Sequence, residues 1–410
     1  MGAVDLPGDL RRLAVYNRLR SYSRQRIITP YDESADGTLP GEGAVAMVIK
    51  RLDDALAGGD RIYGVMRGIG SASRPADPQT TELTAAIATA LQRALNDAAT
   101  QPEAVDLVDA HGSGHPLEDK AENDALEKIF TKRRLPVAVG SAKATVGHTG
   151  AAAGLVSVVK SALSLYHRLM PPLPAFSSPP EGCWDVQRFH IPTHALPWLR
   201  DRRAGPRRSA VLAMTTDGNA GAAIIEEPPA PTQASPRPSA IEQAAPLGPP
   251  PYGLFVLKAA TRTELKADLH RLTEHIHAGR RSQRALAHIA RDWHQRHAPE
   301  GDHALTLSLA LHEDDDIPHE LDRAGARLAG HHPPGAVRSF YSSAPLAANG
   351  DLAFVYPGAG NAYVGMGRKP GLRWPAVLRA DDRATPRLAT QSRPIATMPL
   401  RIEWSTGWEK

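Results

Sequence analysis

Two histidines in glycine-rich surroundings are the residues of this chain best suited to chemistry. The first, His111, follows the apolar run AVDLVDA and opens the stretch HGSGHPLEDKAE. A ring placed where a buried strand ends can face a cavity, and glycines beside it let a bulky ligand approach the backbone. The alternative is a turn whose histidine only caps nearby backbone groups, and this stretch alone leaves both interpretations open.

The second histidine, His148, lies in KATVGHTGAAAG, just before a helix pattern rich in alanine. The positive end of the helix dipole disfavours a protonated ring at that place. A neutral imidazole can donate a hydrogen bond to an oxyanion that develops during a reaction. The alternative is a closely packed core helix that an incidental histidine happens to precede.

The elements around these histidines predict a layered α/β fold. Strands are predicted at 43–50, 104–110, 137–142, 210–216 and 222–227, and helices at 81–99, 119–130 and 151–167. On the helix at 119–130, the apolar residues Ala121, Ala125, Leu126 and Ile129 share one face. Strands that alternate with helices favour layers of helices on a sheet, with His111 at the carboxyl end of one strand.

A proline-rich spacer at 228–251 divides the chain. Residues 1–227 form the first predicted unit. Residues 252–345 carry strand and helix patterns that predict a small α/β module. Residues 346–410 begin with a strand that opens into a glycine loop, which is not a P-loop because the Gly-Lys-Ser/Thr ending is missing.

Composition excludes several classes of protein. The Lys+Arg count of 48 nearly balances the Asp+Glu count of 44, so we expect no nucleic-acid partner. A single cysteine excludes an internal disulfide framework and fits a reducing compartment. No apolar run reaches about 18 residues and no leader is visible, so we expect a cytoplasmic protein without a membrane partner. Hydrophobic residues make up 42% and aromatic residues only 5%, which predicts a core of Ala, Val, Leu and Ile. No metal site is predicted.

Taken together, the two histidine blocks resemble those of the β-ketoacyl synthases, the condensing enzymes of fatty acid and polyketide assembly. The family patterns are His-Gly-Thr-Gly-Thr-x-x-Gly-Asp-x-x-Glu and Lys-x-x-x-x-His-x-x-x-Ala-Ala-Gly, and their order and spacing match. The upstream segment YDESADGTLPGEG resembles a further family block, and AVDLPGD and AMTTDGNAGAAIIEE look closest to ketosynthases of polyunsaturated-fatty-acid and glycolipid synthases. The resemblance implies the C-terminal half of a thiolase-like layered α/β fold.

The later segments resemble parts of modular synthases as well. Residues 252–345 are similar to the module that links a ketosynthase to an acyltransferase. FVYPGAGNAYVGMGR is similar to the opening of the acyltransferase, so residues 346–410 would be its truncated start. Ala359 replaces a glutamine of that opening, and no Gly-His-Ser-x-Gly motif with a catalytic serine follows.

The resemblance implies a reaction and roles for named residues. An acyl group on a cysteine is joined, by decarboxylative Claisen condensation, to a malonyl unit on the phosphopantetheine of an acyl carrier protein. His111 and His148 would hold the malonyl thioester carbonyl and stabilise its enolate. Lys143 and Glu122 would form a buried charged pair that orients these histidines, and Asp119 would brace the loop. The alternatives are a surface lysine and carboxylates that only oppose a helix dipole.

The family resemblance also implies a channel for the substrate arm. Ser113 would line the channel for phosphopantetheine, with His115 beside it in place of the family threonine. The second departure is Glu118, which stands where the family has glycine. The third is Asp217, which lies where a loop with a gating phenylalanine is expected. No permanently bound cofactor is implied.

The largest departure concerns the nucleophile. The family cysteine stands in an Ala-Cys-Ser context, and the only cysteine here, Cys183 in PPEGCWDV, lies in a predicted irregular loop and is assigned no role. We therefore expect the second half of a ketosynthase, inactive in condensation by itself. Three functions are kept as hypotheses: part of a synthase, a non-catalytic subunit that pairs with a polypeptide carrying the N-terminal half, and an inactive remnant. The family also implies a homodimer.

Overall fold

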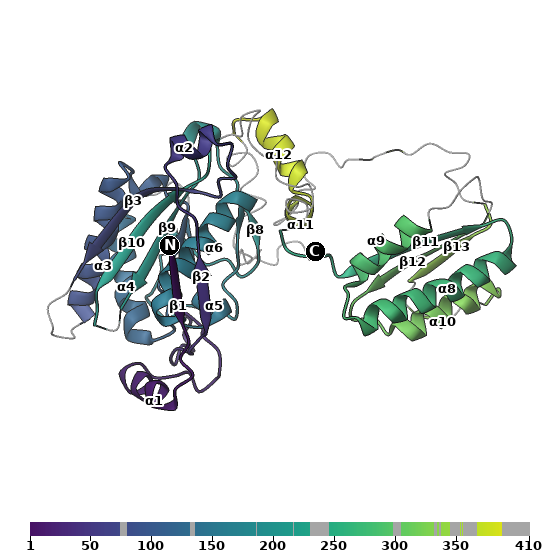
Figure 1. Cartoon of the computed structure of the whole chain (residues 1–410), viewed down its shortest axis with the longest axis horizontal. Helices are drawn as coiled ribbons and strands as arrows, with labels where there is room; N and C mark the ends of the chain where they lie inside the picture. Colours follow the sequence, from purple (N-terminus) through teal and green to yellow (C-terminus); the bar gives the residue numbers. More distant parts are fainter. Residues whose placement is uncertain are drawn as a thin grey trace, which may run out of the picture. The chain divides into compact units, whose positions relative to one another are not determined.

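The structure, a computed structural model, describes twelve segments of the chain. They are residues 1–73, 80–131, 136–185, 187–215, 217–229, 246–297, 305–331, 334–335, 338–344, 353, 355 and 367–387. The chain divides into two compact units, residues 1–246 with 362–410 and residues 247–361 (Figure 1). Most of the proline-rich spacer and the glycine loop with Ala359 lie outside the described residues.

A six-stranded sheet forms the centre of the first unit. In spatial order its strands are β3 (Val65–Ala72), β10 (Ala220–Glu226), β9 (Arg208–Met214), β4 (Leu107–Asp109), β5 (Val137–Gly140) and β7 (Phe189–His190). β4 pairs in parallel with both β5 and β9, whereas β10 pairs antiparallel with β3 and β9. The carboxyl ends of β4, β5 and β9 therefore lie at one edge of the sheet.

Helices cover both faces of this sheet. They are α3 (Thr80–Asp97) and α4 (Pro116–Ile129) on one face and α6 (Ala153–His167) on the other. Successive side chains of β9 point to opposite faces of the sheet. Leu212 therefore packs under α3 and α4, while Val211 packs near Leu165 of α6. α4 begins at Pro116, whose fixed φ suits the first helical position.

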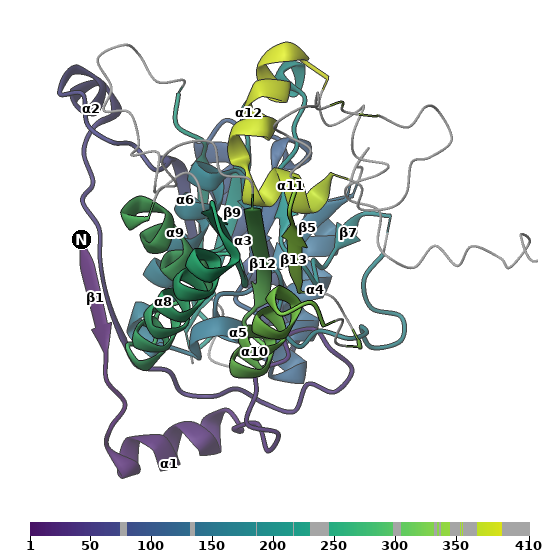
Figure 2. The ribbon, with the colours of Figure 1, turned by 90° about the vertical axis from the view of Figure 1, so that its right-hand side faces the viewer.

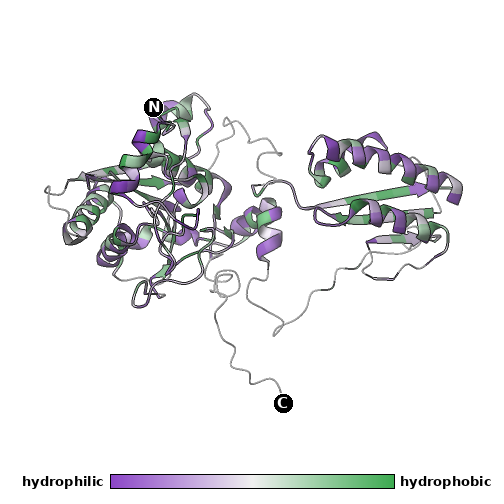
Figure 3. Cartoon of the chain, turned by 90° about the horizontal axis from the view of Figure 1, so that it is seen from below, coloured by the Kyte–Doolittle hydropathy of each residue, from purple (hydrophilic) through white to green (hydrophobic). Residues whose placement is uncertain are grey.

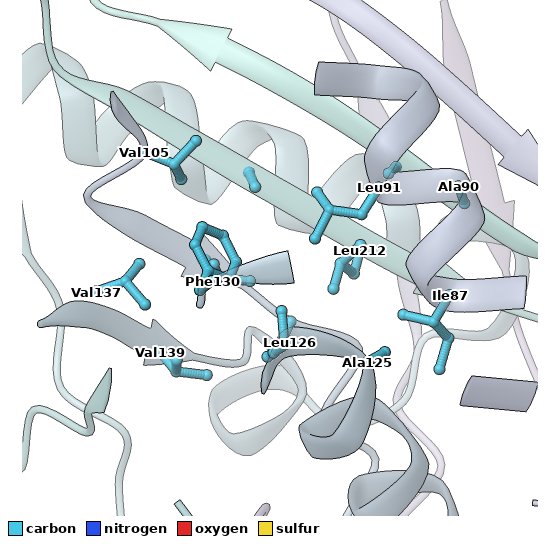
Figure 4. Close-up of a cluster of buried hydrophobic side chains, with 14 of the residues drawn as sticks. Ile87, Ala90, Leu91, Val105, Ala125, Leu126, Phe130, Val137, Val139 and Leu212 are labelled. Carbon is cyan, nitrogen blue, oxygen red and sulfur yellow. The ribbon is translucent and has the colours of Figure 1, made fainter. Parts of the chain in front are cut away.

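The core between the sheet, α3 and α4 is built mainly from small aliphatic side chains. Leu91, Leu126, Phe130, Val139 and Leu212 are each no more than 2% exposed, and Figure 4 shows them meeting from both helices and the strands. Burial of each such side chain stabilises the fold by about 1.5–3 kcal/mol. The predicted core of Ala, Val, Leu and Ile is confirmed for this cluster, to which few aromatic residues contribute.

The N-terminal residues form a two-stranded ribbon and two helices. The elements are β1 (Gly2–Asp5), α1 (Leu10–Leu19), β2 (Gly43–Ala46) and α2 (Leu52–Ala57). The strand predicted at 43–50 ends at Ala46, because its antiparallel partner β1 starts at Gly2, which pairs with Ala46. Asp9 caps α1 by accepting a hydrogen bond from the Arg11 N–H.

The described part of the C-terminal segment packs on the first unit. It forms α11 (Arg368–Arg373) and α12 (Pro375–Ala384). Asp382 of α12 pairs with Arg168 at 2.9 Å, next to the short strands β6 (Leu169–Met170) and β8 (Leu196–Pro197). The backbone N–H of Arg202 also donates to the Pro386 carbonyl at 3.1 Å. No sequence motif predicts this contact.

The described residues of the second unit form a three-stranded antiparallel sheet and three helices. Its elements are β11 (Tyr252–Ala259), α8 (Arg262–Arg281), α9 (Leu286–Arg296), β12 (Leu305–His312), α10 (Ile317–Leu328) and β13 (Ser339–Ser342). α8 and α10 lie side by side in Figure 2, and α8 starts at a capping box between Thr261 and Glu264. The strands are largely green in Figure 3, because alternate residues such as Phe255 and Leu307 are buried under the helices.

Candidate active site

The two histidines meet at the sheet edge where three parallel strands end. His111 follows β4, and Lys143 begins the short helix α5 (Lys143–Val146) after β5. Met214 is the last residue of β9. His148 follows α5, and its ring centroid lies 5.4 Å from that of His111. The expectation that His111 stands at the carboxyl end of a strand is therefore confirmed.

The ring of His111 is held in one tautomer by the neighbouring strand. The ring is buried, with 1% of the residue exposed, and its Nδ1 atom accepts a hydrogen bond from the Met214 N–H at 3.0 Å. An accepting Nδ1 leaves the proton of a neutral ring on Nε2. This Nε2 atom is buried and makes no hydrogen bond, although a carboxylate oxygen of Glu118 lies 3.7 Å away.

The ring of His148 is fixed in the same way by the helix that follows it. Its Nδ1 atom accepts from the Gly150 N–H at 3.1 Å, at the start of the helical turn Gly150–Ala152 that leads into α6. Arg20 places Nη1 3.4 Å from His148 Nε2. Because the Gly150 N–H is a backbone donor whose direction is fixed and Nδ1 accepts it, we assign the proton of His148 to Nε2.

Both histidines are kept neutral by their surroundings. Burial lowers the pKa of His111 to about 3 and that of His148 to about 2, and the nearby charge of Lys143 adds to both effects. The rings therefore carry no charge at neutral pH. The sequence-based expectation of a neutral His148 agrees with this direction.

The lowered pKa of His148 predicts a pH-dependent stability. Below the ordinary pKa of 6.5 the unfolded ring takes up a proton that the folded ring does not, so stability present at pH 7 is lost as pH falls. Between pH 7 and pH 5 this amounts to about 2 kcal/mol. We expect the unfolding free energy, measured with denaturant, to fall between pH 7 and pH 5 in both the wild type and His148→Gln. The fall in the wild type should be larger by this amount. The exposed His194→Gln serves as control, and a parallel fall in all three proteins would contradict the assignment.

Buried charged side chains form hydrogen bonds with the backbone of His111 on both sides. Glu122 accepts the N–H of His111 at 2.7 Å and that of Gly112 at 2.8 Å, while Lys143 Nζ donates to the His111 carbonyl at 2.7 Å. Lys143 and Glu122 are buried as expected of a charged pair, and the two meet through the His111 peptide. Burial raises the pKa of Glu122 and lowers that of Lys143 to about 8.

Asp119 binds the loop that follows His111. Its carboxylate accepts the N–H groups of Ser113 at 3.0 Å, Gly114 at 3.3 Å and Tyr31 at 2.9 Å. Burial raises the pKa of Asp119 to about 8, against the effect of these hydrogen bonds. The three donors arrive from two separate segments, so Asp119 ties this loop to the chain around Tyr31.

Of the two residues predicted to line a channel, one is enclosed in this conformation and the other is half-buried. Ser113 has no exposed surface, and its hydroxyl donates to Glu118 at 2.7 Å. His115 is half-buried at the start of α4. A phosphopantetheine arm would contact Ser113 only after Glu118 has moved, so the predicted channel remains a prediction.

The glycines beside the histidines make room for the chain itself, which corrects the expectation that they admit a ligand. A Cβ on Gly112, whose φ is +43°, would lie 2.7 Å from Cβ of Ser141. A Cβ on Gly114, whose φ is +77°, would lie 2.7 Å from the carbonyl oxygen of Gly37. Both positive φ values favour glycine in any case.

Gly41 is a third glycine on which the site depends. Its N–H donates to the His148 carbonyl at 3.0 Å, and a Cβ there would lie 2.3 Å from the carbonyl oxygen of Val146. We expect Gly41→Ala to lower the unfolding free energy by about 1–3 kcal/mol through this overlap. Gly43→Ala is the matched control, since its Cβ makes only an ordinary contact at 3.6 Å. Equal unfolding midpoints for the two variants in denaturant would contradict this expectation.

Sequence reasoning missed several groups of the site. The Tyr31 hydroxyl donates to Glu122 at 2.5 Å, and the Ser141 hydroxyl lies within hydrogen-bond distance of the carbonyl oxygens of His111, at 3.1 Å, and Gly112, at 3.0 Å. Tyr31 belongs to the YDESADG block and Ser141 to VAVGSA, so the motifs contained both without indicating a role. Arg20 lies in no motif, and only the fold brings it to the histidines.

A cavity of about 260 Å³ adjoins the site. Its lining includes Arg12, Tyr16, Arg20, His148 and Thr215. Cys183 lies instead in the loop before β7, where it packs against the core cluster. In the segments that the structure describes, no group of three or more His, Cys, Asp or Glu side chains is arranged to hold a metal ion. None of the described helices has the length and apolar character needed to cross a membrane.

Comparison with known proteins identifies the class. Residues 1–55 match the family model of the β-ketoacyl synthase N-terminal domain, and residues 63–177 match that of the C-terminal domain. These matches confirm the resemblance to the β-ketoacyl synthases over these segments. The solved oxazolomycin ketosynthase domain OzmH KS7 of Streptomyces albus is 23% identical with a TM-score of 0.51, covering 83% of this chain and 56% of that one. The expected thiolase-like α/β fold is thereby confirmed.

The relatives with similar sequences are polyketide synthases. A mycocerosic acid synthase-like polyketide synthase of Mycobacterium tuberculosis is 30% identical over 371 residues, which cover 89% of this chain and 17% of that protein. Polyketide synthase GfsA of Streptomyces halstedii is 32% identical over 402 residues, which cover 93% of this chain and 5% of that protein. The chain thus spans less than a fifth of either relative.

Proposed function

We propose that this chain supplies the histidine centre of a β-ketoacyl synthase within a polyketide synthase. The substrate would be a malonyl-type thioester on the phosphopantetheine of an acyl carrier protein. One observation carries the proposal: both Nδ1 atoms accept backbone N–H groups, so His111 and His148 each present an Nε2–H. Two such neutral donors stabilise negative charge that develops on one oxygen in a site with little water.

The reaction needs no proton from these rings. The thioester oxygen accepts both N–H bonds while the bond to the carboxylate carbon breaks, its electron pair enters the enolate, and CO2 leaves. The enolate carbon then attacks an acyl thioester, whose thiolate departs. The lowered pKa values keep His111 and His148 neutral, which prevents them from quenching the enolate by protonation.

Other parts of the proposal follow from the family. Cys183 takes no part, so the acyl group would be held on another thiol. Residues 252–345 would be the module between ketosynthase and acyltransferase, and residues 346–410 the start of an acyltransferase. Matches that cover 89% and 93% of this chain support a shared order of modules. Acyl carrier protein and a second ketosynthase copy are the proposed partners.

A non-catalytic partner subunit is the second candidate function. It is favoured by the ion pair between Arg20 and Glu118, which lies at 2.5 Å beside both histidines and occupies part of the histidine centre. In such a subunit the histidine centre would bind no substrate, and the pair would never open.

Decarboxylation is the step that tests the proposed function. The measurement is the release of CO2, with formation of acetyl-carrier protein, when the full chain is incubated with malonyl-carrier protein. We expect release that the double variant His111→Ala, His148→Ala lacks. Equal release by both proteins would overturn the catalytic proposal and leave the partner subunit.

A further inference from the structure

The guanidinium of Arg20 reaches into the histidine centre. The residue directly follows α1, and its side chain is 9% exposed. Nε pairs with Glu118 at 2.5 Å, and Nη2 donates to the Thr215 carbonyl at 3.0 Å. Nη1 lies 3.4 Å from Nε2 of His148. With the ring proton assigned to Nε2, both atoms of this contact are donors, and an acceptor between them would satisfy both.

A second donor of the site also lacks an acceptor. Nε2 of His111 is buried and makes no hydrogen bond, and Glu118 at 3.7 Å is too distant to accept one. N–H groups of Arg20, His111 and His148 therefore converge on a region beside Glu118. The other carboxylate at the adjoining cavity, Asp5, is paired with Arg12 at 2.6 Å. Unpaired buried donors are costly, so this region favours a further anion.

The cavity gives such an anion access. Arg20, His148 and Thr215 line its volume of about 260 Å³, and Glu118 does not. A carboxylate in the cavity can therefore reach the guanidinium and compete with Glu118 for its N–H groups. Release of Glu118 would also free the Ser113 hydroxyl, which now donates a hydrogen bond to it.

We propose that Arg20 binds the free carboxylate of a carboxyacyl thioester in exchange for Glu118. The inference rests on the proposed function and names the residue that would select its malonyl-type thioester over simple acyl thioesters. The planar guanidinium suits a carboxylate because it forms two parallel N–H···O bonds. Before substrate binds, the carboxylate of Glu118 occupies the place beside Arg20. The substrate carboxylate then replaces it.

This role separates binding from the chemical step. Arg20 would bind the carboxylate before it leaves as CO2, so its contact stabilises the bound substrate more than the transition state. Loss of Arg20 would therefore raise KM more than it lowers kcat. Arg20 is in this sense a specificity-determining residue.

The test compares two unreactive ligands in the full chain by calorimetry. The probes are malonyl-pantetheine amide and acetyl-pantetheine amide, in which an amide replaces the thioester. We expect Arg20→Gln to weaken malonyl binding about tenfold or more and to leave acetyl binding unchanged. Glu118→Gln removes the competing charge at nearly constant volume and should tighten malonyl binding several-fold. Arg18→Gln is the matched control, since it removes one charge from the exposed face of the same helix.

Two results would overturn the inference. One is equal malonyl affinity in the wild type and Arg20→Gln, and the other is an equal loss in Arg18→Gln. If Arg20→Gln does not fold by circular dichroism, Glu118→Gln decides, and unchanged malonyl affinity then counts against the exchange. The probes bind without turnover, so this outcome is separate from the decarboxylation assay that tests the histidines.

Discussion

Replacing Glu122 with alanine is expected to lower the unfolding free energy of the first unit by about 3–5 kcal/mol. The carboxylate is fully buried and accepts three bonds, from the backbone N–H groups of His111 and Gly112 and from the Tyr31 hydroxyl. Its removal leaves these donors unsatisfied and leaves the buried charge of Lys143 without its nearby counter-charge. The measurement is denaturant unfolding of the full chain, followed by circular dichroism.

Two controls separate this effect from general sensitivity of the chain. Glu103→Ala, on the exposed surface before β4, should change the unfolding free energy by no more than about 0.5 kcal/mol. Tyr31→Phe removes one of the three bonds and should cost about 1–1.5 kcal/mol. If Glu122→Ala lowers the unfolding free energy no more than Tyr31→Phe does, the hydrogen bonds of Glu122 to the His111 and Gly112 backbone do not stabilise the loop.

Much of the histidine centre could be predicted from the sequence, because its residues lie within short motifs. His111, Asp119 and Glu122 share one strand–loop–helix segment, and Lys143 and His148 share another. Local spacing therefore fixes which groups face the loop, and the parallel pairing of β4 with β5 brings the two segments together. The spacing of apolar residues likewise predicted helix α4 and its buried face, on which Ala121, Ala125 and Leu126 are fully buried.

The remaining features depend on contacts between distant segments, which no local pattern records. Arg20 and Glu118 are paired only because α1 ends beside the sheet edge. Ser141, in the loop after β5, fills the space beside Gly112. Glycine is therefore needed at position 112 for packing, whereas the sequence suggested that it makes room for a ligand. Lys143 and Glu122 are both buried as the sequence predicted, but each binds the His111 peptide that lies between them.

Replacing His148 alone with alanine is expected to slow decarboxylation of malonyl-carrier protein by about 10²–10³, the loss typical of one oxyanion donor. The ring is fixed by the Gly150 N–H at 3.1 Å, and its segment is held by the His148 N–H bond to the Leu39 carbonyl at 2.8 Å. The donor is therefore positioned before the reaction starts, so its effect falls on kcat. This distinguishes His148 from Arg20, whose loss should act mainly on KM.

The exposed His194→Ala is the control for this comparison, since it removes an imidazole from the same unit without touching the site. Its rate should equal that of the wild type. Because both active-site rings stay neutral well below pH 5, the wild-type rate should show no loss near the ordinary histidine pKa of 6.5 as pH falls from 7 to 5. A rate that falls with an apparent pKa near 6.5, or a His148→Ala rate within threefold of wild type, would mean that His148 does not stabilise the enolate as a neutral donor.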